Sequence, residues 1–276
     1  MYLDLFFSSH LIFTTKELRE YLRNVHDCPA QTVEERSISL ISYHQKHGHI
    51  LQIRRGLYYT VPRGSISSEY PVDPYLIAGK LSEDAVLAFN TALGVHGISH
   101  SMTSFFYYLT QDISKRRFLF QGCTYQPIFP DIHLRKADKA NFGITNINYQ
   151  GVNLRVTTLE RTLVDTLHRP LLVGELEEIW LSLEGITYLN VDEVVEYTLL
   201  LSQSTVAAKV GFFLEEHKQQ YHVAEHLLEK LRERCPKTPY YFQRKPQGTQ
   251  KLIPGWNLIV PESLLKRQWE EPYADL

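Results

Sequence analysis

The chain has 276 residues, of which 43% are hydrophobic and 22% charged, and its formal net charge is −2. This length favours two domains, and the composition excludes both intrinsic disorder and the strongly basic balance of a protein that coats nucleic acid non-specifically. The sequence contains no apolar run of the roughly 20 residues that a membrane helix needs, and residues 1–10 lack the basic flank of a secretory signal. Three widely spaced cysteines disfavour a disulfide framework, so we expect a cytoplasmic protein that does not associate with membranes.

The first pattern in chain order is a pair of helices. Thr14 can cap a helix, and Glu17, three residues later, can bond back to the amide of the cap. This helix loses its signal at Asp27-Cys28-Pro29. A second helix is expected from Thr32 to His47, with Gly48 as its left-handed stop.

A short basic hairpin is expected after the second helix. Residues 50–53 and 57–61 have the composition of strands, and Arg54-Arg55-Gly56 forms the turn between them. Two helices followed by such a hairpin are the outline of a winged helix-turn-helix, in which the second helix enters the major groove of DNA.

The second predicted helix has one apolar and one polar face. The residues expected to face the core are Val33, Ile38, Leu40 and Ile41. The other side carries short polar and cationic residues, namely Arg36, Ser39, Ser42, Tyr43 and Lys46. Such a face suits a major groove, where arginine forks onto guanine and lysine contacts phosphates. Together with Arg54 and Arg55 at the hairpin tip, these are the predicted DNA-binding residues. The alternative is an ordinary amphipathic helix with a solvated face.

Proline, glycine and serine cluster in residues 62–71, so we place a domain boundary between residues 65 and 66. Residues 1–65 carry eight Lys/Arg and six Asp/Glu, whereas residues 66–276 carry 21 and 25. This modest basic excess fits weak non-specific binding that tightens on the right sequence, as a monomer or a dimer on DNA.

Residues 66–276 predict a larger mixed α/β domain, with sheet in its first half and helices in its second, and the whole chain is therefore of the α+β class. The expected strands are 103–110, 117–121, 125–129, 132–135 and 152–156. The expected helices are 73–81, 85–95, a helix from Thr157 with Glu160 in its capping box, 175–183, 191–201, 205–216 and 223–234. Short extended segments at 240–243 and 256–260 close the chain.

Four landmarks in this order resemble those of the AbiEi-type antitoxins, the regulator half of bacterial toxin–antitoxin operons. They are residues 55–58 (RGLY), 91–97 (TALGVHG), 160–165 (ERTLVD) and 209–215 (KVGFFLE), with 256–258 (WNL) after the last. The resemblance spans residues 12–261. It implies that the N-terminal domain, residues 1–65, binds operator DNA of its own operon and represses it. It also implies that residues 66–276 counteract a nucleotidyltransferase-like toxin, whether or not the two proteins bind directly.

Two other functions stay open at this point. One is a DNA-binding regulator whose larger domain senses a ligand or a partner. The other is a nuclease or a nucleotidyltransferase fused to a DNA-targeting module. The nearest acidic fragments, Asp131-Ile132-His133 and Glu177-Glu178, lack the phosphate-binding turn and the lysine that these enzymes need.

The other polar clusters have structural interpretations. Arg161 and Asp165 are four residues apart, as in an ordinary intrahelical ion pair. His44, His47 and His49 have a spacing that could hold zinc, but only Cys28 lies near them in the sequence. We therefore predict a protein that is not an enzyme and needs no cofactor or metal.

Overall fold

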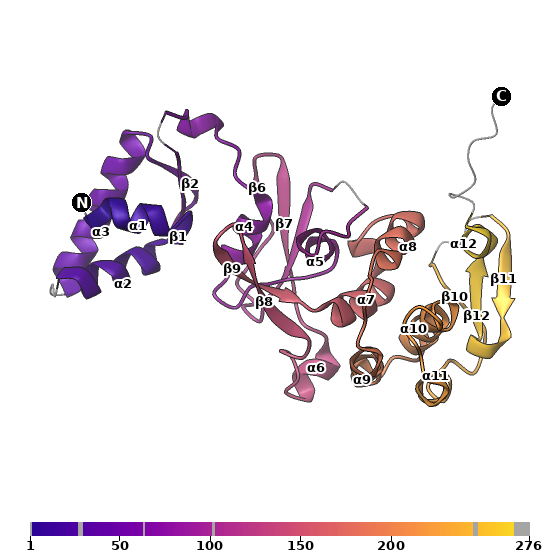
Figure 1. Ribbon diagram of the computed structural model, residues 1–276. Helices are drawn as coiled ribbons and strands as arrows, with labels where there is room; N and C mark the ends of the chain where they lie inside the picture. Colours follow the sequence, from indigo (N-terminus) through magenta and orange to yellow (C-terminus); the bar gives the residue numbers. More distant parts are fainter. Residues whose placement is uncertain (1, 27–29, 63, 101–102, 245–247, 268–276) are drawn as a thin grey trace, which may run out of the picture. The chain divides into compact units, whose positions relative to one another are not determined.

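The computed structural model describes residues 2–26, 30–62, 64–100, 103–244 and 248–267. The described residues form helices and three sheets, which confirms the predicted α+β class (Figure 1). The chain divides into two compact units: unit 1 comprises residues 1–87, 104–128 and 146–155, and unit 2 comprises residues 88–103, 129–145 and 156–276. Unit 1 thus contains residues on both sides of position 65, and the functional boundary at 65/66 stays a prediction. Each helix in the described part of the chain is too short or too polar to cross a bilayer.

The first 60 residues of unit 1 form helices and a three-stranded antiparallel sheet with the strand order β1-β3-β2. The elements are α1 (Tyr2–Ser9), β1 (Ile12–Thr14), α2 (Thr15–His26), α3 (Ala30–Lys46), β2 (Ile50–Arg54) and β3 (Leu57–Thr60). The predicted helix pair and hairpin are confirmed, and Gly48, with a φ of +69°, follows α3 as expected. The predicted end of the first helix at 27–29 lies outside the described residues. That this segment acts as a winged helix-turn-helix stays a prediction.

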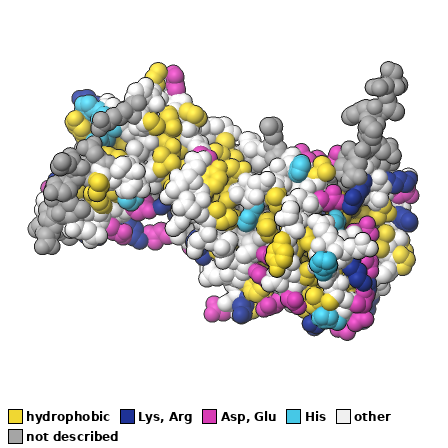
Figure 2. All heavy atoms as spheres, in the orientation of Figure 1, with side chains coloured by type: hydrophobic (Ala, Val, Ile, Leu, Met, Phe, Trp, Pro, Cys, Tyr) yellow, Lys and Arg dark blue, Asp and Glu magenta, His cyan; other side chains and the backbone are white. Residues whose placement is uncertain are grey.

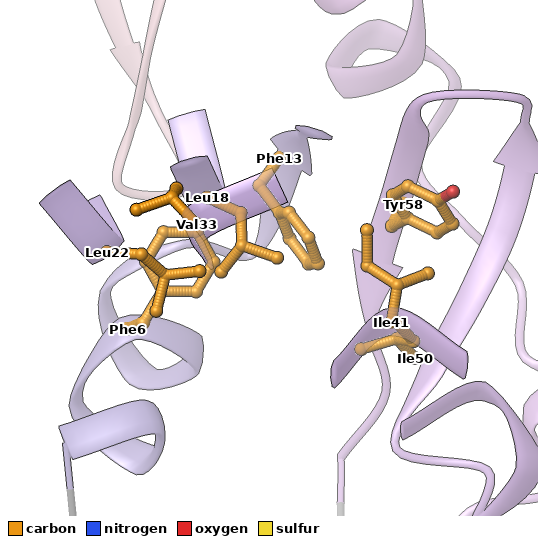
Figure 3. Close-up of a cluster of buried hydrophobic side chains, with 8 residues drawn as sticks. All are labelled: Phe6, Phe13, Leu18, Leu22, Val33, Ile41, Ile50 and Tyr58. Carbon is orange, nitrogen blue, oxygen red and sulfur yellow. The ribbon is translucent and has the colours of Figure 1, made fainter. Parts of the chain in front are cut away.

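The sequence did not indicate α1 and β1. The eight residues of α1 form only about two helical turns, and the three residues of β1 are too few to show an alternation of apolar and polar side chains. Neither element therefore shows a clear hydrophobic period in the sequence. Each nevertheless adds a side chain to a common core (Figure 3). All six elements contribute to this core, with the side chains of Phe6, Phe13, Leu18, Leu22, Val33, Ile41, Ile50 and Tyr58. The helices of this segment are therefore fixed against its sheet by a single apolar cluster.

The rest of unit 1 is built around a six-stranded sheet with the order β6-β7-β5-β4-β9-β8. Its elements are α4 (Pro74–Lys80), β4 (Val86–Leu87), β5 (Phe105–Leu109), β6 (Phe118–Phe120), β7 (Cys123–Ile128), β8 (Ile144–Tyr149) and β9 (Val152–Thr157). β5 pairs with β7 in parallel and with β4 antiparallel. β8 begins in unit 2 and continues into unit 1, and β9 begins in unit 1 and ends in unit 2. α4 packs against β5 and β1, and Gly79 of this helix allows Leu154 of β9 to approach closely.

Two predicted elements in this region are wrong. Residues 85–95 were expected to form one helix, but Val86 and Leu87 are a central strand and only Asn90–Val95 is helical. A continuous apolar run such as the one around Val86 and Leu87 is compatible with a helix or with a buried strand. Here the run pairs between β5 and β9 in the sheet and is therefore a strand. Residues 132–135 were expected to form a strand and instead form a helix. The Asp131 carboxylate accepts a hydrogen bond from the His133 amide at 2.8 Å and thereby caps that helix.

Unit 2 is mainly helical and ends in a small sheet with the order β10-β12-β11. Its helices are α5 (Asn90–Val95), α6 (Ile132–Lys136), α7 (Leu159–His168), α8 (Leu176–Glu184), α9 (Val191–Leu201), α10 (Ser204–Glu216), α11 (Glu225–Arg232) and α12 (Glu262–Lys266). Its strands are β10 (Tyr240–Tyr241), β11 (Gln250–Ile253) and β12 (Leu258–Pro261). The four helices expected between residues 175 and 234 are confirmed as α8 to α11. β8 and β11 had not been predicted.

A buried ion pair lies in α7 of unit 2. The Arg161 guanidinium is 3.3 Å from the Asp165 carboxylate, and both side chains are over nine-tenths buried. Arg161 also donates to the carbonyls of Ala140 and Phe142, at 3.0 and 2.6 Å, and Tyr197 donates to Asp165 at 2.8 Å. The predicted pairing at a spacing of four is thus confirmed, but the pair is buried rather than on the helix surface. Loss of one partner would leave the other charge buried and unpaired, which costs far more than a surface pair contributes.

The predicted capping box of this helix is wrong. Thr158, not Thr157, is the N-cap, and its hydroxyl accepts a hydrogen bond from the Arg161 amide at 3.3 Å. Thr157 still belongs to β9, and its hydroxyl bonds to that of Thr162 at 2.7 Å. The Glu160 carboxylate accepts instead from the Asn190 amide at 3.0 Å. Because β9 extends through Thr157, the N-cap of the helix moves one residue later, to Thr158. Either of the two adjacent threonines could have served as the cap, so the sequence did not decide between them.

The landmark at 209–215 and the one at 256–258 meet in the structure. Gly211 of α10 lies directly against the fully buried indole of Trp256, and a Cβ atom at position 211 would overlap that ring. The Trp256 indole donates to the Glu215 carboxylate at 2.7 Å, and the Arg232 guanidinium lies 5.0 Å from the ring centroid. Glycine is therefore required in mid-helix by close packing, although it weakens a helix by about 1 kcal/mol relative to alanine.

We expect the Gly211→Ala substitution to lower the free energy of unfolding by about 2 kcal/mol, because the added methyl group displaces the Trp256 ring. Gly255→Ala is the matched control, since a Cβ there has no heavy atom within 4 Å. Urea denaturation of both variants tests this. An unfolding free energy for Gly211→Ala equal to or above that of the wild type would contradict the packing argument.

Candidate nucleic-acid interface

The structure places all five predicted contact residues of α3 on the solvent-exposed side of the helix. Arg36, Ser39, Ser42, Tyr43 and Lys46 are exposed, and 54% of the Tyr43 surface is accessible. The hydroxyl of Ser39 bonds back to the Glu35 carbonyl at 3.0 Å, so it keeps its capacity to accept hydrogen bonds. The face is therefore polar, cationic and open along about three turns of helix.

The side of α3 that holds it to the core is narrow. Val33, Ser37 and Ile41 are buried, at a constant spacing of four residues. Arg19 of α2 donates to the Ser37 hydroxyl at 3.1 Å and to the Glu34 carboxylate at 2.9 Å. The predicted burial of Ile38 is wrong, because 58% of its surface is exposed. Residues spaced four apart shift gradually around a helix, so the buried stripe runs through Ser37. The packing of α2 therefore buries Ser37 and leaves its apolar neighbour Ile38 exposed.

The two arginines of the hairpin have different surroundings. Arg55 is exposed beside Gly56, whose φ of +85° makes the tight turn. Arg54 is half-buried, and its guanidinium donates to the Leu81 carbonyl at 2.6 Å. Arg55 is thus the freer of the two for a phosphate, whereas Arg54 already fastens the hairpin to the end of α4. Its predicted contact with DNA stays untested.

Two ion pairs lie beside this Arg54 contact and tie α2 to the same region. Lys80 of α4 binds the Glu17 carboxylate, and Lys16 lies 3.0 Å from Glu83. The Thr14 amide donates to Glu17 at 2.7 Å, and the Glu17 amide donates to the Thr14 hydroxyl at 3.2 Å, so the predicted capping box is confirmed. Burial alone would raise the pKa of Glu17, but the bonds from Lys80 and Thr14 lower it below its ordinary value.

Sequence reasoning missed two exposed residues on the same face of α3. Thr32 and Glu35 lie one turn before Arg36 and Ser39 and are exposed. A carboxylate in this place repels phosphates but can accept a hydrogen bond from a cytosine amino group. Counting back by four from Ser39 would have identified Glu35. Its negative charge partly offsets that of Arg36, and it is one of the six acidic residues that keep the basic excess of residues 1–65 modest.

The histidines at the end of α3 form a contact cluster. The Nδ1 atoms of His44 and His49 are 3.0 Å apart, and the ring of His47 lies 4.1 Å from that of Tyr43. Within the described ranges, no group of three or more His, Cys, Asp or Glu side chains is arranged to hold a metal ion. The His47 ring supports Tyr43 at the C-terminal end of the exposed face.

The sequence matches no known protein-family model and no curated protein. Its fold is similar to the crystal structure of the RV2827C protein from Mycobacterium tuberculosis, with a TM-score of 0.58 and 15% sequence identity. The alignment covers 98% of this chain and 93% of that chain. At this identity the likeness establishes a shared fold. Because the alignment spans nearly the full length of both proteins, the order of the elements is shared along the whole chain.

The two hairpin arginines should differ in their effect on stability. We expect Arg54→Ala to lower the free energy of unfolding by about 1–2 kcal/mol, because the Leu81 carbonyl loses its charged donor. Arg55→Ala removes the same charge from an exposed position and should change stability by less than about 0.5 kcal/mol. Chemical denaturation of both variants at one salt concentration checks this. Equal effects would mean that the Arg54 contact contributes nothing.

Proposed function

We propose that this protein is an antitoxin and a transcriptional autorepressor of a bacterial toxin–antitoxin operon. In this proposal the segment 1–65 binds operator DNA of its own operon in the cytoplasm, and residues 66–276 counteract a co-encoded nucleotidyltransferase-like toxin. Neither role requires catalysis, a cofactor or a metal. The observation that carries the proposal is the exposed polar and cationic face of α3, which is held from behind by an apolar core.

Each side chain of this face has a role that suits a major groove. Arg36 has a planar guanidinium that can donate two hydrogen bonds to the O6 and N7 atoms of guanine. Ser39 and Ser42 are small enough for the helix to approach the base edges closely. Lys46 suits a phosphate, and Arg55 suits the backbone next to the groove. Tyr43, supported by His47, can donate from its hydroxyl to a phosphate or a base.

The charge of the segment bears on how it would bind. Residues 1–65 have a net charge of +2, so a single copy offers few phosphate contacts. Affinity for random DNA should then be weak, and specific affinity should depend on base contacts and on a second copy bound to an inverted repeat. The second copy can be supplied in two ways. Either a monomer binds one half of the repeat before the next copy arrives, or two copies associate as a dimer on the DNA.

The antitoxin half of the proposal is supported by the landmarks that resemble the AbiEi family. In the structure these residues serve packing: Arg161 and Asp165 form the buried pair, Gly211 fits Trp256, and His96 bonds to the Thr157 carbonyl at 2.8 Å. A shared core of this kind supports a shared fold. Antitoxicity would then depend on the surface of residues 66–276, and it would not require a stable complex with the toxin.

We expect the purified protein to bind the DNA upstream of its own gene more tightly than random DNA, and the affinity to fall with salt. Arg36→Ala should cost about 1–3 kcal/mol on the operator and relax the preference at one base pair. Lys46→Ala should weaken all duplexes similarly and reduce the salt slope by about one. Fluorescence anisotropy over a salt series measures both effects.

Lys136→Ala is the matched control for this experiment, because Lys136 is an exposed cation of unit 2 in α6. Its substitution should leave operator binding unchanged. Autorepression through α3 would be refuted by a wild-type protein that binds its upstream DNA no better than random DNA. It would also be refuted if Lys136→Ala weakened binding as much as Arg36→Ala.

The antitoxin role predicts a growth phenotype. Expression of the reading frame next to this gene should arrest a bacterial host, and co-expression of this protein from an independent promoter should restore growth. The Arg36→Ala/Lys46→Ala double variant should restore growth equally well, because it alters only the DNA-binding face. Colony counts measure both. The antitoxin role would be refuted if the neighbouring reading frame were harmless, or if it were toxic and this protein did not restore growth. Only the role as a transcriptional regulator would then remain.

A further inference from the structure

The turn that ends α3 is a Schellman motif, a glycine turn that brings together two side chains five residues apart in the sequence. Gly48 supplies the left-handed conformation, with a φ of +69°, and its amide donates to the Gln45 carbonyl at 3.1 Å. The His49 amide donates to the His44 carbonyl at 2.9 Å, which is the second hydrogen bond of the motif. In most such turns the side chains of these last two positions make an apolar contact. Here both are histidines, so the turn places two imidazole rings beside each other.

The two rings meet through their nitrogen atoms, because the Nδ1 atoms of His44 and His49 lie 3.0 Å apart. The ring of His44 is half-buried and makes a T-shaped contact with Phe7 of α1, with 4.7 Å between the ring centroids, whereas His49 is exposed. His47 does not take part, because its Nδ1 atom donates to the Tyr43 carbonyl at 2.7 Å. Histidine side chains gather on the visible surface of this N-terminal segment (Figure 2). One ring of the pair is thus anchored, and the other is open to solvent.

The separation of the two Nδ1 atoms fits two neighbouring ligands of one metal ion. Metal–nitrogen bonds of about 2.05 Å at an angle of 90–109° hold the two nitrogen atoms about 2.9–3.3 Å apart. The observed 3.0 Å lies inside this range. Each neutral imidazole keeps its one proton on Nε2 when both Nδ1 lone pairs turn to the ion, so no proton has to leave the pair. Imidazole is a preferred ligand of Zn²⁺, Ni²⁺ and Cu²⁺, whereas Mg²⁺ and Ca²⁺ prefer oxygen.

We propose that His44 and His49 bind one divalent transition-metal ion, such as Zn²⁺, Ni²⁺ or Cu²⁺, across the turn between α3 and β2. Two protein ligands are fewer than those of catalytic or structural zinc sites, so water completes the coordination and the ion exchanges with solvent. The apolar core of the first 60 residues is complete without the ion, and neither the fold nor the proposed reading of DNA requires it. When bound, the ion joins the end of α3 to the start of β2 and stabilises the folded segment.

Isothermal titration calorimetry tests the site directly. The full-length chain, purified without a polyhistidine tag, is titrated separately with Zn²⁺, Ni²⁺, Cu²⁺ and Mg²⁺. We expect the tightest site to hold one transition-metal ion per chain, with Cu²⁺ bound most strongly and Mg²⁺ not bound. The H44Q/H49Q variant should lose about tenfold or more in affinity for all three transition metals, because glutamine removes both imidazole ligands. His49→Gln alone should lose affinity as well, and it leaves the contact between His44 and Phe7 intact.

The matched control is H222Q/H226Q, which removes two exposed histidines of unit 2. This variant should keep the affinity and the stoichiometry of the tightest site. Thermal unfolding gives a second readout, because an ion that binds the folded state raises the unfolding temperature. Saturating Zn²⁺ should raise it for the wild type and for H222Q/H226Q, but not for H44Q/H49Q. Unfolding without added metal confirms that each variant is folded, and His49→Gln carries the test if the double variant is not.

Three results would overturn the proposal. The first is a wild-type protein that binds none of the three transition metals, in which case one imidazole ring only donates a hydrogen bond to the other. The second is wild-type affinity in His49→Gln and in H44Q/H49Q, which would place the ion elsewhere in the chain. The third is an equal loss of affinity in H222Q/H226Q, which would mean that exposed histidines bind metal regardless of the turn at Gly48.

Discussion

The exposed face of α3 depends on how little of this helix is used to hold it. Val33, Ser37 and Ile41 form a buried stripe at a constant spacing of four, and the core beneath that stripe receives a side chain from every element between α1 and β3. A narrow stripe leaves most of the helix circumference to solvent. If the sheet or α2 contacted a broader face, Arg36 and Lys46 would be covered, and the helix would have nothing to offer a groove.

The same segment is fastened to the end of α4 by charges as well as by apolar contacts. Arg54, Lys16 and Glu17 all bond to residues between positions 80 and 83, so the hairpin and the start of α2 share one support. A side chain held in such a support is limited in where it can reach, because its head group stays beside the bonded partner. This distinguishes Arg54 from Arg55, although the two are neighbours in the sequence and have the same charge.

The landmark residues of unit 2 are explained by packing, and the proposed activities belong to surfaces. Gly211 is needed because an indole occupies the space of its missing side chain, and Arg161 is needed because two carbonyls and a carboxylate surround it. Groove recognition needs a protruding helix with hydrogen-bonding side chains, and the exposed side of α3 carries such side chains.

The sequence by itself determined the elements whose signals are local. The capping box at Thr14 and Glu17, the stop at Gly48, the hairpin around Gly56 and the helices of residues 175–234 follow from caps, glycine and periodicity, which act within a few residues. Tertiary structure decided where local signals were ambiguous or silent. The β4 strand, the burial of Ser37 in place of Ile38 and the role of Arg54 all depend on a partner distant in the sequence. Such partners carry no signal at the residue itself, because burial and pairing are properties of two segments and become fixed only when the chain brings them together.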